Sequence, residues 1–266
     1  MSIIIPMAGF GKRFSDAGYT NIKPLIPVTH YRNNASYPMV IAATKDLVQH
    51  KNITEPLIFI LRNHPDFKNV QDQIIQFFPN AQFKILDFPT KGQACTCLEA
   101  KLLLNPNDPV LIGACDNGML YDIEKFNMLK QSSDCIVFTF SDPVVTENPA
   151  QYGWVVPDKK NKETVKKVSV KIPISKLPEH DYAIVGAFWF KHFSLFEDAT
   201  KLLIERNITV NNEFYVDSVI NIMIQSNNRV SHLPVKKYLC WGTPTAYETY
   251  EKTLSYWKNF SKTISL

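Results

Sequence analysis

Short apolar runs alternate with amphipathic stretches along the first half of the chain. The apolar runs are SIIIP, PLIFIL, FKILDF and PVLIGA, and stretches such as MVIAATKDLVQH and NVQDQIIQFF between them have apolar residues at helical spacing. Strands that alternate with helices in this way form βαβ units around a parallel sheet. We therefore predict an α/β fold of Rossmann-like, three-layer type, with a mostly parallel mixed sheet and ligands at the carboxyl ends of its strands.

The pattern changes after residue 140. Residues 141–181 contain prolines, lysines and short alternating pieces that are typical of hairpins, and YAIVGAFWF at 182–190 has the composition of a buried strand. The further elements expected are helices at 192–205 and 213–225, a strand near 229–234 and a helix from about residue 245. We expect one domain over residues 1–266, with a β-rich insert at about 141–190 that binds part of the substrate.

Composition and charge argue against several classes of protein. Apolar residues make up 45% and charged residues 20% of the 266 positions, as in ordinary globular proteins rather than disordered or fibrous ones. The net charge is only +4, and no block of five or more lysines and arginines occurs, so no nucleic-acid partner is predicted. No run approaches the roughly 18 apolar residues that a membrane helix needs. We therefore expect no membrane partner.

The cysteines and the N-terminal residues indicate in which cellular compartment the protein works. The five cysteines include no C-x-x-C pair, so neither a zinc site nor a disulfide framework is predicted. The N-terminal apolar stretch is short, and its charges follow it, which is the wrong order for a secretory signal. These features predict reduced thiols and a cytoplasmic protein.

The segment PMAGFGKRF joins the end of a strand to two glycines and two cations. Gly9 and Gly11 allow a sharp turn whose backbone N–H groups point into one concavity, which suits a phosphate. Lys12 and Arg13 add positive charge. A dinucleotide fingerprint fits poorly because Phe14 replaces the third glycine, and the G-K-[ST] of a Walker loop is missing. A plain loop with incidental cations is the structural alternative.

A second loop, NIKPLIPV, places Lys23 about ten residues after the arginine. The order of these features, a strand, a glycine loop with arginine and then a K-P loop, resembles that of the sugar-phosphate nucleotidylyltransferase family. These enzymes are the nucleoside-diphosphate-sugar pyrophosphorylases, which include glucose-1-phosphate thymidylyltransferases. The resemblance implies that Arg13 contacts the departing pyrophosphate and that Lys23 contacts the α-phosphate. The nucleotide-binding loop that it implies consists of Ala8, Gly9, Gly11 and Lys12.

Further segments extend the resemblance over roughly residues 2–255. TKGQACTCLEA is similar to the family's nucleobase segment, which implies that Gly92 and Gln93 approach the base. VLIGACDNGM has a buried strand that ends in Asp116, where the family has the aspartate that binds the catalytic Mg²⁺. Without the other motifs, a turn-capping aspartate would be an equally good interpretation of Asp116.

The segment KKVSVKIPIS, followed by YAIVGAFWF, resembles the family's pattern for the sugar 1-phosphate. It implies that Lys171 holds the phosphate and that Gly186 lets the sugar lie close to the backbone. Val170 stands where a glutamate that contacts sugar hydroxyls is usual, so the acceptor can be a sugar 1-phosphate or another phosphomonoester.

Two later segments are also similar to the family. NNEFYVDSVINIMI is expected to begin a helix with Asn211 or Asn212 as N-cap and Glu213 in the first turn, from which Glu213 can reach the acceptor. A purely structural role for this helix start is the alternative interpretation.

LCWGTPTAYETY resembles a closing D-x-G-T-P motif, but Cys240 replaces the second metal aspartate. A thiol is a poor ligand for Mg²⁺. We therefore expect either Asp116 with phosphates and water, or another carboxylate such as Asp217, to hold the ion.

Taken together, the motifs predict a nucleotidylyltransferase that uses Mg²⁺, a nucleoside triphosphate and a phosphorylated small molecule. The motifs do not determine which nucleobase or which acceptor the enzyme uses. A cytidylyltransferase acting on a non-sugar phosphate is one alternative within this class. A glycosyltransferase is a weaker alternative because Asp116 is not part of a D-x-D pair. A nucleotide-binding protein without turnover is the third, motivated by Val170 and Cys240. The family's usual setting is surface polysaccharide synthesis, and apolar surfaces on the insert leave a homo-oligomer open.

Overall fold

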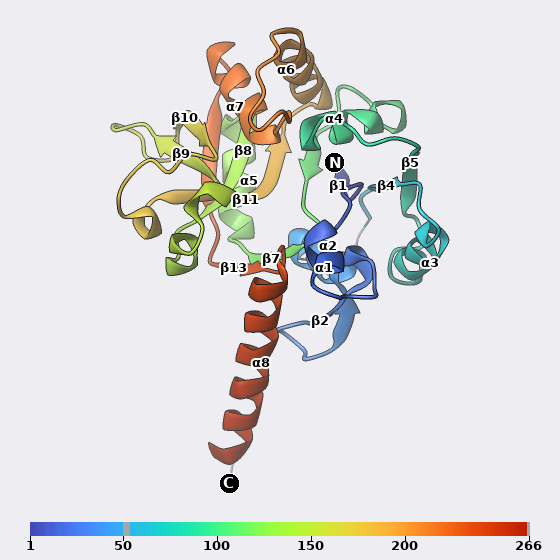
Figure 1. Cartoon of the computed structure of the whole chain (residues 1–266). Helices are drawn as coiled ribbons and strands as arrows, with labels where there is room; N and C mark the ends of the chain where they lie inside the picture. Colours follow the sequence, from blue (N-terminus) through green and yellow to red (C-terminus); the bar gives the residue numbers. More distant parts are fainter. Residues whose placement is uncertain (50–53, 265–266) are drawn as a thin grey trace.

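A mixed sheet forms the centre of the computed structural model, which describes residues 1–49 and 54–264 (Figure 1). Its strands are β1 (Ser2–Pro6), β4 (Leu57–Arg62), β5 (Gln82–Leu86), β6 (Val110–Ile112), β8 (Cys135–Phe140), β9 (Gly153–Pro157), β10 (Val165–Val170), β11 (Tyr182–Phe190) and β12 (Val230–Pro234). Within the described residues this is a nine-stranded sheet in the order β10-β9-β11-β6-β1-β4-β5, with β8 pairing both β11 and β12.

The first half of the chain supplies the parallel part of the sheet. Strand β1 lies between parallel neighbours β4 and β6, and β5 runs parallel to β4. Strand β11 is antiparallel to β6, β8 and β9, and β10 pairs with β9 as an antiparallel edge strand. The predicted mixed sheet is thus confirmed. The hairpin strands of the predicted insert extend this same sheet, instead of packing on it as a separate layer.

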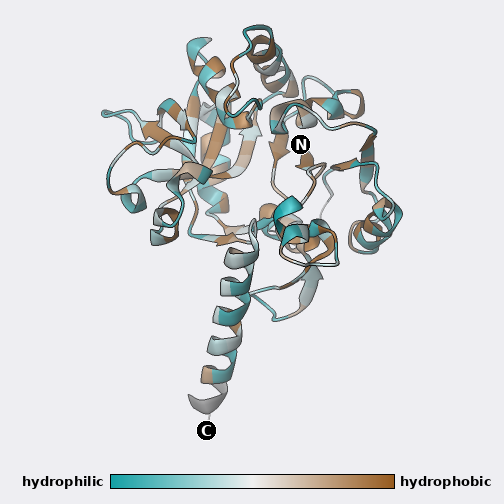
Figure 2. Ribbon diagram, viewed as in Figure 1, coloured by the Kyte–Doolittle hydropathy of each residue, from teal (hydrophilic) through white to brown (hydrophobic). Residues whose placement is uncertain are grey.

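Helices cover both faces of the sheet. On one face lie α2 (Met39–Val48), α3 (Phe67–Phe77) and α5 (Ile123–Ser132); on the other lie α4 (Gln93–Leu98), α6 (Phe193–Glu205) and α7 (Val216–Gln225). Successive side chains of a strand point to opposite faces. Ile3 and Ile5 accordingly join the core under α3, whereas Ile4 joins the core under α7. Hydrophobic residues follow the central strands in Figure 2, and the three-layer arrangement is confirmed.

The remaining elements surround one end of the sheet. They are α1 (Lys12–Asp16), the hairpin β2 (Pro27–Thr29) and β3 (Ser36–Pro38), the antiparallel ribbon β7 (Asn117–Leu120) and β13 (Lys237–Cys240), and α8 (Pro244–Ile264). Short 3₁₀ turns lie at Lys23–Leu25, Glu99–Leu103, Pro143–Thr146, Pro149–Gln151 and Pro178–His180. Helix α8 projects from the body (Figure 1). Among the described residues, no helix is both long and apolar enough to cross a bilayer.

The expected start of the helix at residue 213 is wrong. Helix α7 begins at Val216, with Tyr215 as its N-cap residue. Asn211 and Asn212 are not caps; both have left-handed backbone conformations, with φ of 50° and 62°. They form a tight turn that places Glu213 before the helix.

Contacts with a distant segment explain this difference. The Phe214 N–H donates to the carbonyl of Lys91 at 2.8 Å, and the Phe214 carbonyl accepts from the N–H of Ala94 at 3.0 Å. These bonds hold residue 214 in an extended connection beside the start of α4. Asp217 is consequently the acidic residue in the first turn of α7.

Candidate active site

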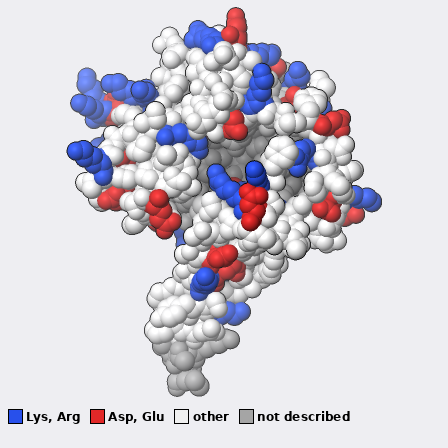
Figure 3. Space-filling model, in the orientation of Figure 1, with Lys and Arg blue, Asp and Glu red and all other residues white. Residues whose placement is uncertain are grey.

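Two adjoining cavities lie at the carboxyl ends of β1 and β6. The larger has a volume of about 490 Å³ and the smaller about 260 Å³, and Gln93 lines both. Figure 3 shows a hollow in the middle of this face, with lysine and arginine atoms at its edge. An open-sided cavity at this end of the strands, lined by Arg13 and Lys171 as well as Asp116 and Asp217, can hold an anionic ligand together with a cation.

Two of the predicted residues form a direct ion pair beside the larger cavity. The Lys23 Nζ donates to Asp116 Oδ2 at 2.6 Å and to the carbonyl of Gly242 at 3.4 Å. Burial lowers the pKa of Lys23, but the charge of Asp116, the neighbouring Cys115 thiol and the hydrogen bond to Asp116 together outweigh burial and leave this pKa raised. Gly11, at φ 62°, allows the two loops to meet, because a Cβ there would lie 3.1 Å from the Lys23 Cβ. Lys23 is therefore held as a cation against Asp116.

Asp116 lies in the connection between β6 and β7, and not at the end of a single strand as predicted. Its carbonyl accepts from the N–H of Trp241 at 3.0 Å. A Cβ built at Gly242 would lie 3.3 Å from the Asp116 carboxylate and 3.9 Å from the Cys240 sulfur. Cys240 is thus a neighbour of Asp116, and burial raises the pKa of its thiol. The residue at the expected position of a second carboxylate is a neutral thiol.

The donor set suits Mg²⁺ held through a single carboxylate. Mg²⁺ in proteins commonly keeps several waters and binds one or two carboxylates together with substrate phosphates. Asp116 provides one such carboxylate at the cavity, although Lys23 already occupies its Oδ2. Among the described residues, no group of three or more His, Cys, Asp or Glu side chains could form a closed metal cage.

A second lysine, Lys171, lines the larger cavity. Lys171 has a left-handed φ of 61°, its Nζ donates to the Gln151 carbonyl, and it lies 5.1 Å from the centre of the Tyr215 ring. Burial lowers the pKa of Lys171, and the charge of Asp217 opposes that shift. An anionic ligand beside Lys171 would stabilise its charged form.

Asp217 lies close to Lys171, against Gly153. Burial raises the pKa of Asp217 to about 6, and the charge of Lys171 acts in the opposite direction. A Cβ built at Gly153 would penetrate the Asp217 carboxylate and lie 2.9 Å from its Cγ. Glycine at 153 therefore makes room for a buried carboxylate that lines the cavity.

We expect Gly153→Ala to destabilise the protein by roughly 1–3 kcal/mol, the usual cost of overpacking a buried site. Urea denaturation of the two proteins measures the difference. Gly9→Ala is the matched control, because a Cβ at Gly9 would meet no atom within 4 Å. Equal stability of the Gly153→Ala and wild-type proteins would contradict the close contact between Gly153 and Asp217.

The smaller cavity brings together four of the six predicted nucleotide-binding residues, including Gly92 and Gln93 expected at the base. It is lined by Ala8, Gly9, Gly92, Gln93 and Glu213, among others. Gly92 has φ 116°, and a Cβ there would lie 2.6 Å from both N and O of the Phe214 backbone, so only glycine fits. Glu213, which we expected on the acceptor, lines this cavity and not the larger one.

The other predicted residues occupy different places. Arg13, Asp116, Lys171 and Gly186 line the larger cavity, while Lys12 is exposed at the start of α1 and lines neither. Sequence reasoning missed Tyr215, Gln151 and Asn117, which also line the larger cavity. Asn117 donates from Nδ2 to the Val185 carbonyl at 3.0 Å and so fixes the backbone next to Gly186. Its position directly after Asp116 was the available signal.

Comparison with known proteins shows a shared fold. No protein-family model and no curated protein sequence matches the chain. The nucleoside-diphosphate-sugar pyrophosphorylase from Vibrio cholerae RC9 superposes with a TM-score of 0.76 at 20% identity, covering 93% of this chain and 98% of that one. The inositol-1-phosphate CTP transferase from T. maritima superposes with a TM-score of 0.67 at 10% sequence identity, covering 94% of this chain and 93% of that one. A UDP-glucose pyrophosphorylase complexed with UDP-glucose superposes with a TM-score of 0.68 at 17% sequence identity, covering 97% of this chain and 98% of that one.

Proposed function

We propose that the protein transfers a nucleoside monophosphate from a nucleoside triphosphate to a phosphomonoester and releases pyrophosphate. The observation that carries this proposal is the meeting of Arg13, the Lys23–Asp116 pair and Lys171 around two adjoining cavities, one of which is lined by a glycine loop. Several cationic groups around one cavity suit a reaction between two phosphates. The nucleotidylyltransferase structures with this fold support the same activity.

The reaction needs little covalent chemistry from the protein. An oxygen of the acceptor phosphate attacks the α-phosphorus, a new P–O bond forms, the bond to the β-phosphate breaks, and pyrophosphate leaves with the electron pair. The acceptor phosphate is ionised at pH 7, so the step requires no general base. Catalysis then depends on positioning and on stabilising negative charge.

Each cation has a place in this scheme. We assign the departing pyrophosphate to Arg13, the α-phosphate to Lys23 and the acceptor phosphate to Lys171. Without these cations, the two anionic substrates would repel each other inside the cavity. Asp116 would hold Mg²⁺, which supplies neutralisation of the triphosphate charge when bound.

The acceptor proposed first is a sugar 1-phosphate. Structures named for UDP-glucose and for inositol 1-phosphate share this fold, so both a sugar and a non-sugar phosphate are reasonable substrates to test. Val170 is 8% exposed and offers no carboxylate to acceptor hydroxyls. We further propose that residues 1–266 act as one catalytic domain whose segment at about 141–190 contacts the acceptor.

Pyrophosphate release tests the proposed function. UTP, CTP, GTP, ATP and dTTP are each combined with Mg²⁺ and with a panel of sugar 1-phosphates and non-sugar phosphomonoesters. We expect release with one preferred nucleotide and only when an acceptor is present. Nucleotide binding without release for any acceptor would instead favour a binding protein that lacks turnover.

Lys171→Met is expected to raise the KM for the acceptor by roughly 10- to 100-fold, as loss of a charged hydrogen bond to a substrate does. The KM for the nucleotide should change much less, because Lys171 lines the larger cavity, whereas the glycine loop lines the smaller one. Steady-state kinetics with each substrate varied in turn measure both. Lys167→Met, at an exposed position of β10, is the matched control. Equal increases in both KM values would argue against the assigned contact.

A further inference from the structure

Asp217 is a buried carboxylate of the larger cavity to which the proposed reaction gives no role. The residue is 9% exposed and lines the cavity together with Lys171. Burial raises its pKa to about 6, so the carboxylate is ionised at pH 7. Apart from its own backbone N–H, no described residue donates a hydrogen bond to this carboxylate, and no described lysine, arginine or histidine nitrogen lies within 4 Å of it.

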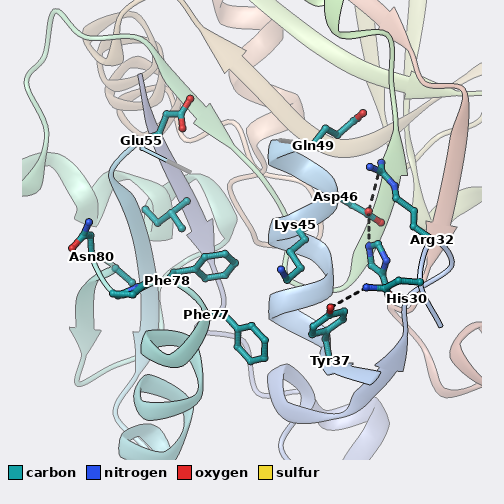
Figure 4. A pocket seen from close by; sticks show the side chains of 14 residues that line it. His30, Arg32, Tyr37, Lys45, Asp46, Gln49, Glu55, Phe77, Phe78 and Asn80 are labelled. Atoms are coloured by element: carbon teal, nitrogen blue, oxygen red, sulfur yellow. Dashed lines mark hydrogen bonds and ion pairs between the residues drawn. The ribbon is translucent and has the colours of Figure 1, made fainter. Parts of the chain in front are cut away.

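Asp46, the other buried aspartate of the described residues, shows how this chain usually treats such a group (Figure 4). Its Oδ1 has Nε2 of His30 at 3.0 Å and a guanidinium nitrogen of Arg32 at 3.9 Å, and its Oδ2 is enclosed. Neither oxygen of Asp217 is enclosed in that way, so its carboxylate is open to the cavity. Buried polar groups normally have hydrogen-bond partners. A ligand in the cavity is the partner that Asp217 lacks.

One short segment holds both Asp217 and Lys171 in place. The Lys171 Nζ donates to the Gln151 carbonyl, and the Lys171 backbone N–H donates to the Tyr152 carbonyl at 3.1 Å. Gly153, the next residue, contacts the Asp217 carboxylate, because a Cβ built there would lie 2.9 Å from its Cγ. Burial lowers the pKa of Lys171, and among the charges around it that of Asp217 opposes the shift most strongly. The cavity wall therefore has a cation and an anion close together that do not form an ion pair.

We propose that Asp217 selects the acceptor by binding a hydroxyl or ammonium group that the acceptor carries beside the phosphate held by Lys171. A ligand with an anion and a hydrogen-bond donor close together is complementary to this pair of side chains. Val170 is apolar and 8% exposed, so it cannot provide the contact from the strand next to Lys171. The inference rests on the proposed function for the ligand's being the acceptor.

Equilibrium dialysis of the full chain tests this contact with phosphomonoesters that differ in the donor group. Glycerol 1-phosphate and 2-aminoethyl phosphate are compared with propyl phosphate, and glucose 1-phosphate is compared with cyclohexyl phosphate. Propyl and cyclohexyl phosphate have no donor beside the phosphate. Each probe is measured with the protein alone, and again with Mg²⁺ and the unreactive α,β-methylene analogues of UTP, CTP, GTP, ATP and dTTP.

Wild-type protein is compared with Asp217→Leu, which removes the carboxylate but retains much of the side-chain volume. Asp198→Leu, at an exposed position of α6, is the matched control. Circular dichroism and the melting temperature establish that each variant is folded, and Asp217→Ala replaces Asp217→Leu if that variant fails to fold.

For at least one matched set, we expect wild type and Asp198→Leu to bind the donor-bearing probe at least about tenfold more tightly than the donor-free one, the scale of a hydrogen bond to a charged group. In Asp217→Leu, the ratio of these two Kd values should fall to about one. An indirect effect through Lys171 would weaken both probes alike, so the ratio isolates the contact with Asp217. Preference for glycerol 1-phosphate or glucose 1-phosphate would identify a hydroxyl, and preference for 2-aminoethyl phosphate an ammonium group.

The same ratio in wild type and Asp217→Leu, a ratio near one in wild type, or no binding of any probe would overturn the inference. Because dialysis needs no turnover, its outcome is separate from that of the proposed function. Pyrophosphate release with an unchanged ratio would overturn the role of Asp217 alone. A ratio lost in Asp217→Leu without any pyrophosphate release would retain the contact and remove the transfer reaction.

Discussion

Asp116→Asn is expected to lower pyrophosphate release by roughly 1,000-fold or more, the scale of losing a central charge in phosphoryl transfer. The substitution keeps the shape of the side chain but removes the carboxylate that would hold Mg²⁺. It also removes the anion that positions Lys23 at 2.6 Å. Pyrophosphate release at saturating Mg²⁺, together with the melting temperature, measures the effect.

Asp108→Asn provides the control for this experiment. Asp108 is exposed and precedes β6, so its variant should retain wild-type turnover. A folded Asp116→Asn protein with turnover within tenfold of wild type would remove Asp116 from the reaction and would contradict the placement of Mg²⁺.

Lys23→Met should lower turnover by roughly 100- to 10,000-fold, because a cation that stabilises developing negative charge is worth several kcal/mol in a preorganised site. Methionine retains the apolar part of the side chain that packs in the loop. The substitution leaves Asp116 without its ion-pair partner, so part of the loss would come from repulsion between that carboxylate and the triphosphate. Single-turnover measurements at saturating nucleotide separate a slower chemical step from weaker nucleotide binding.

Lys101→Met is the matched control, since Lys101 is exposed on a 3₁₀ turn, whereas Lys23 is largely buried and paired with Asp116 beside the larger cavity. Wild-type turnover in the Lys23→Met protein would show that the α-phosphate lies elsewhere. A loss confined to nucleotide affinity would give Lys23 a binding role only.

The fold could be predicted because its main signal is local. The run SIIIP predicts a strand buried on both faces. The alternation of side chains along a strand then puts Ile3 and Ile5 in one core and Ile4 in the other, as the structure has them. The start of α7 could not be predicted in the same way. It depends on hydrogen bonds between Phe214 and the segment at Lys91 and Ala94, which only the folded chain brings together.

The candidate site was predictable by residue type but less so by arrangement. Lys23 and Asp116 are 93 residues apart, and no spacing rule predicts that they form an ion pair. The placement of Glu213 depends on the same distant contacts that fix Phe214. The burial of Asp46 on α2 gave no signal either, because a charged residue in a helix is usually exposed, whereas Asp46 is 1% exposed.

The fate of the α-phosphate tests the central claim most directly. Each nucleoside triphosphate, labelled with ³²P at the α-position, is incubated with Mg²⁺, the acceptor panel and the protein, and the products are treated with alkaline phosphatase. The proposed reaction predicts a labelled, phosphatase-resistant product that forms only with an acceptor and in equal amount to pyrophosphate. Label that alkaline phosphatase releases entirely as inorganic phosphate with every acceptor, as it does from unreacted triphosphate or from nucleoside monophosphate, would contradict nucleotidyl transfer.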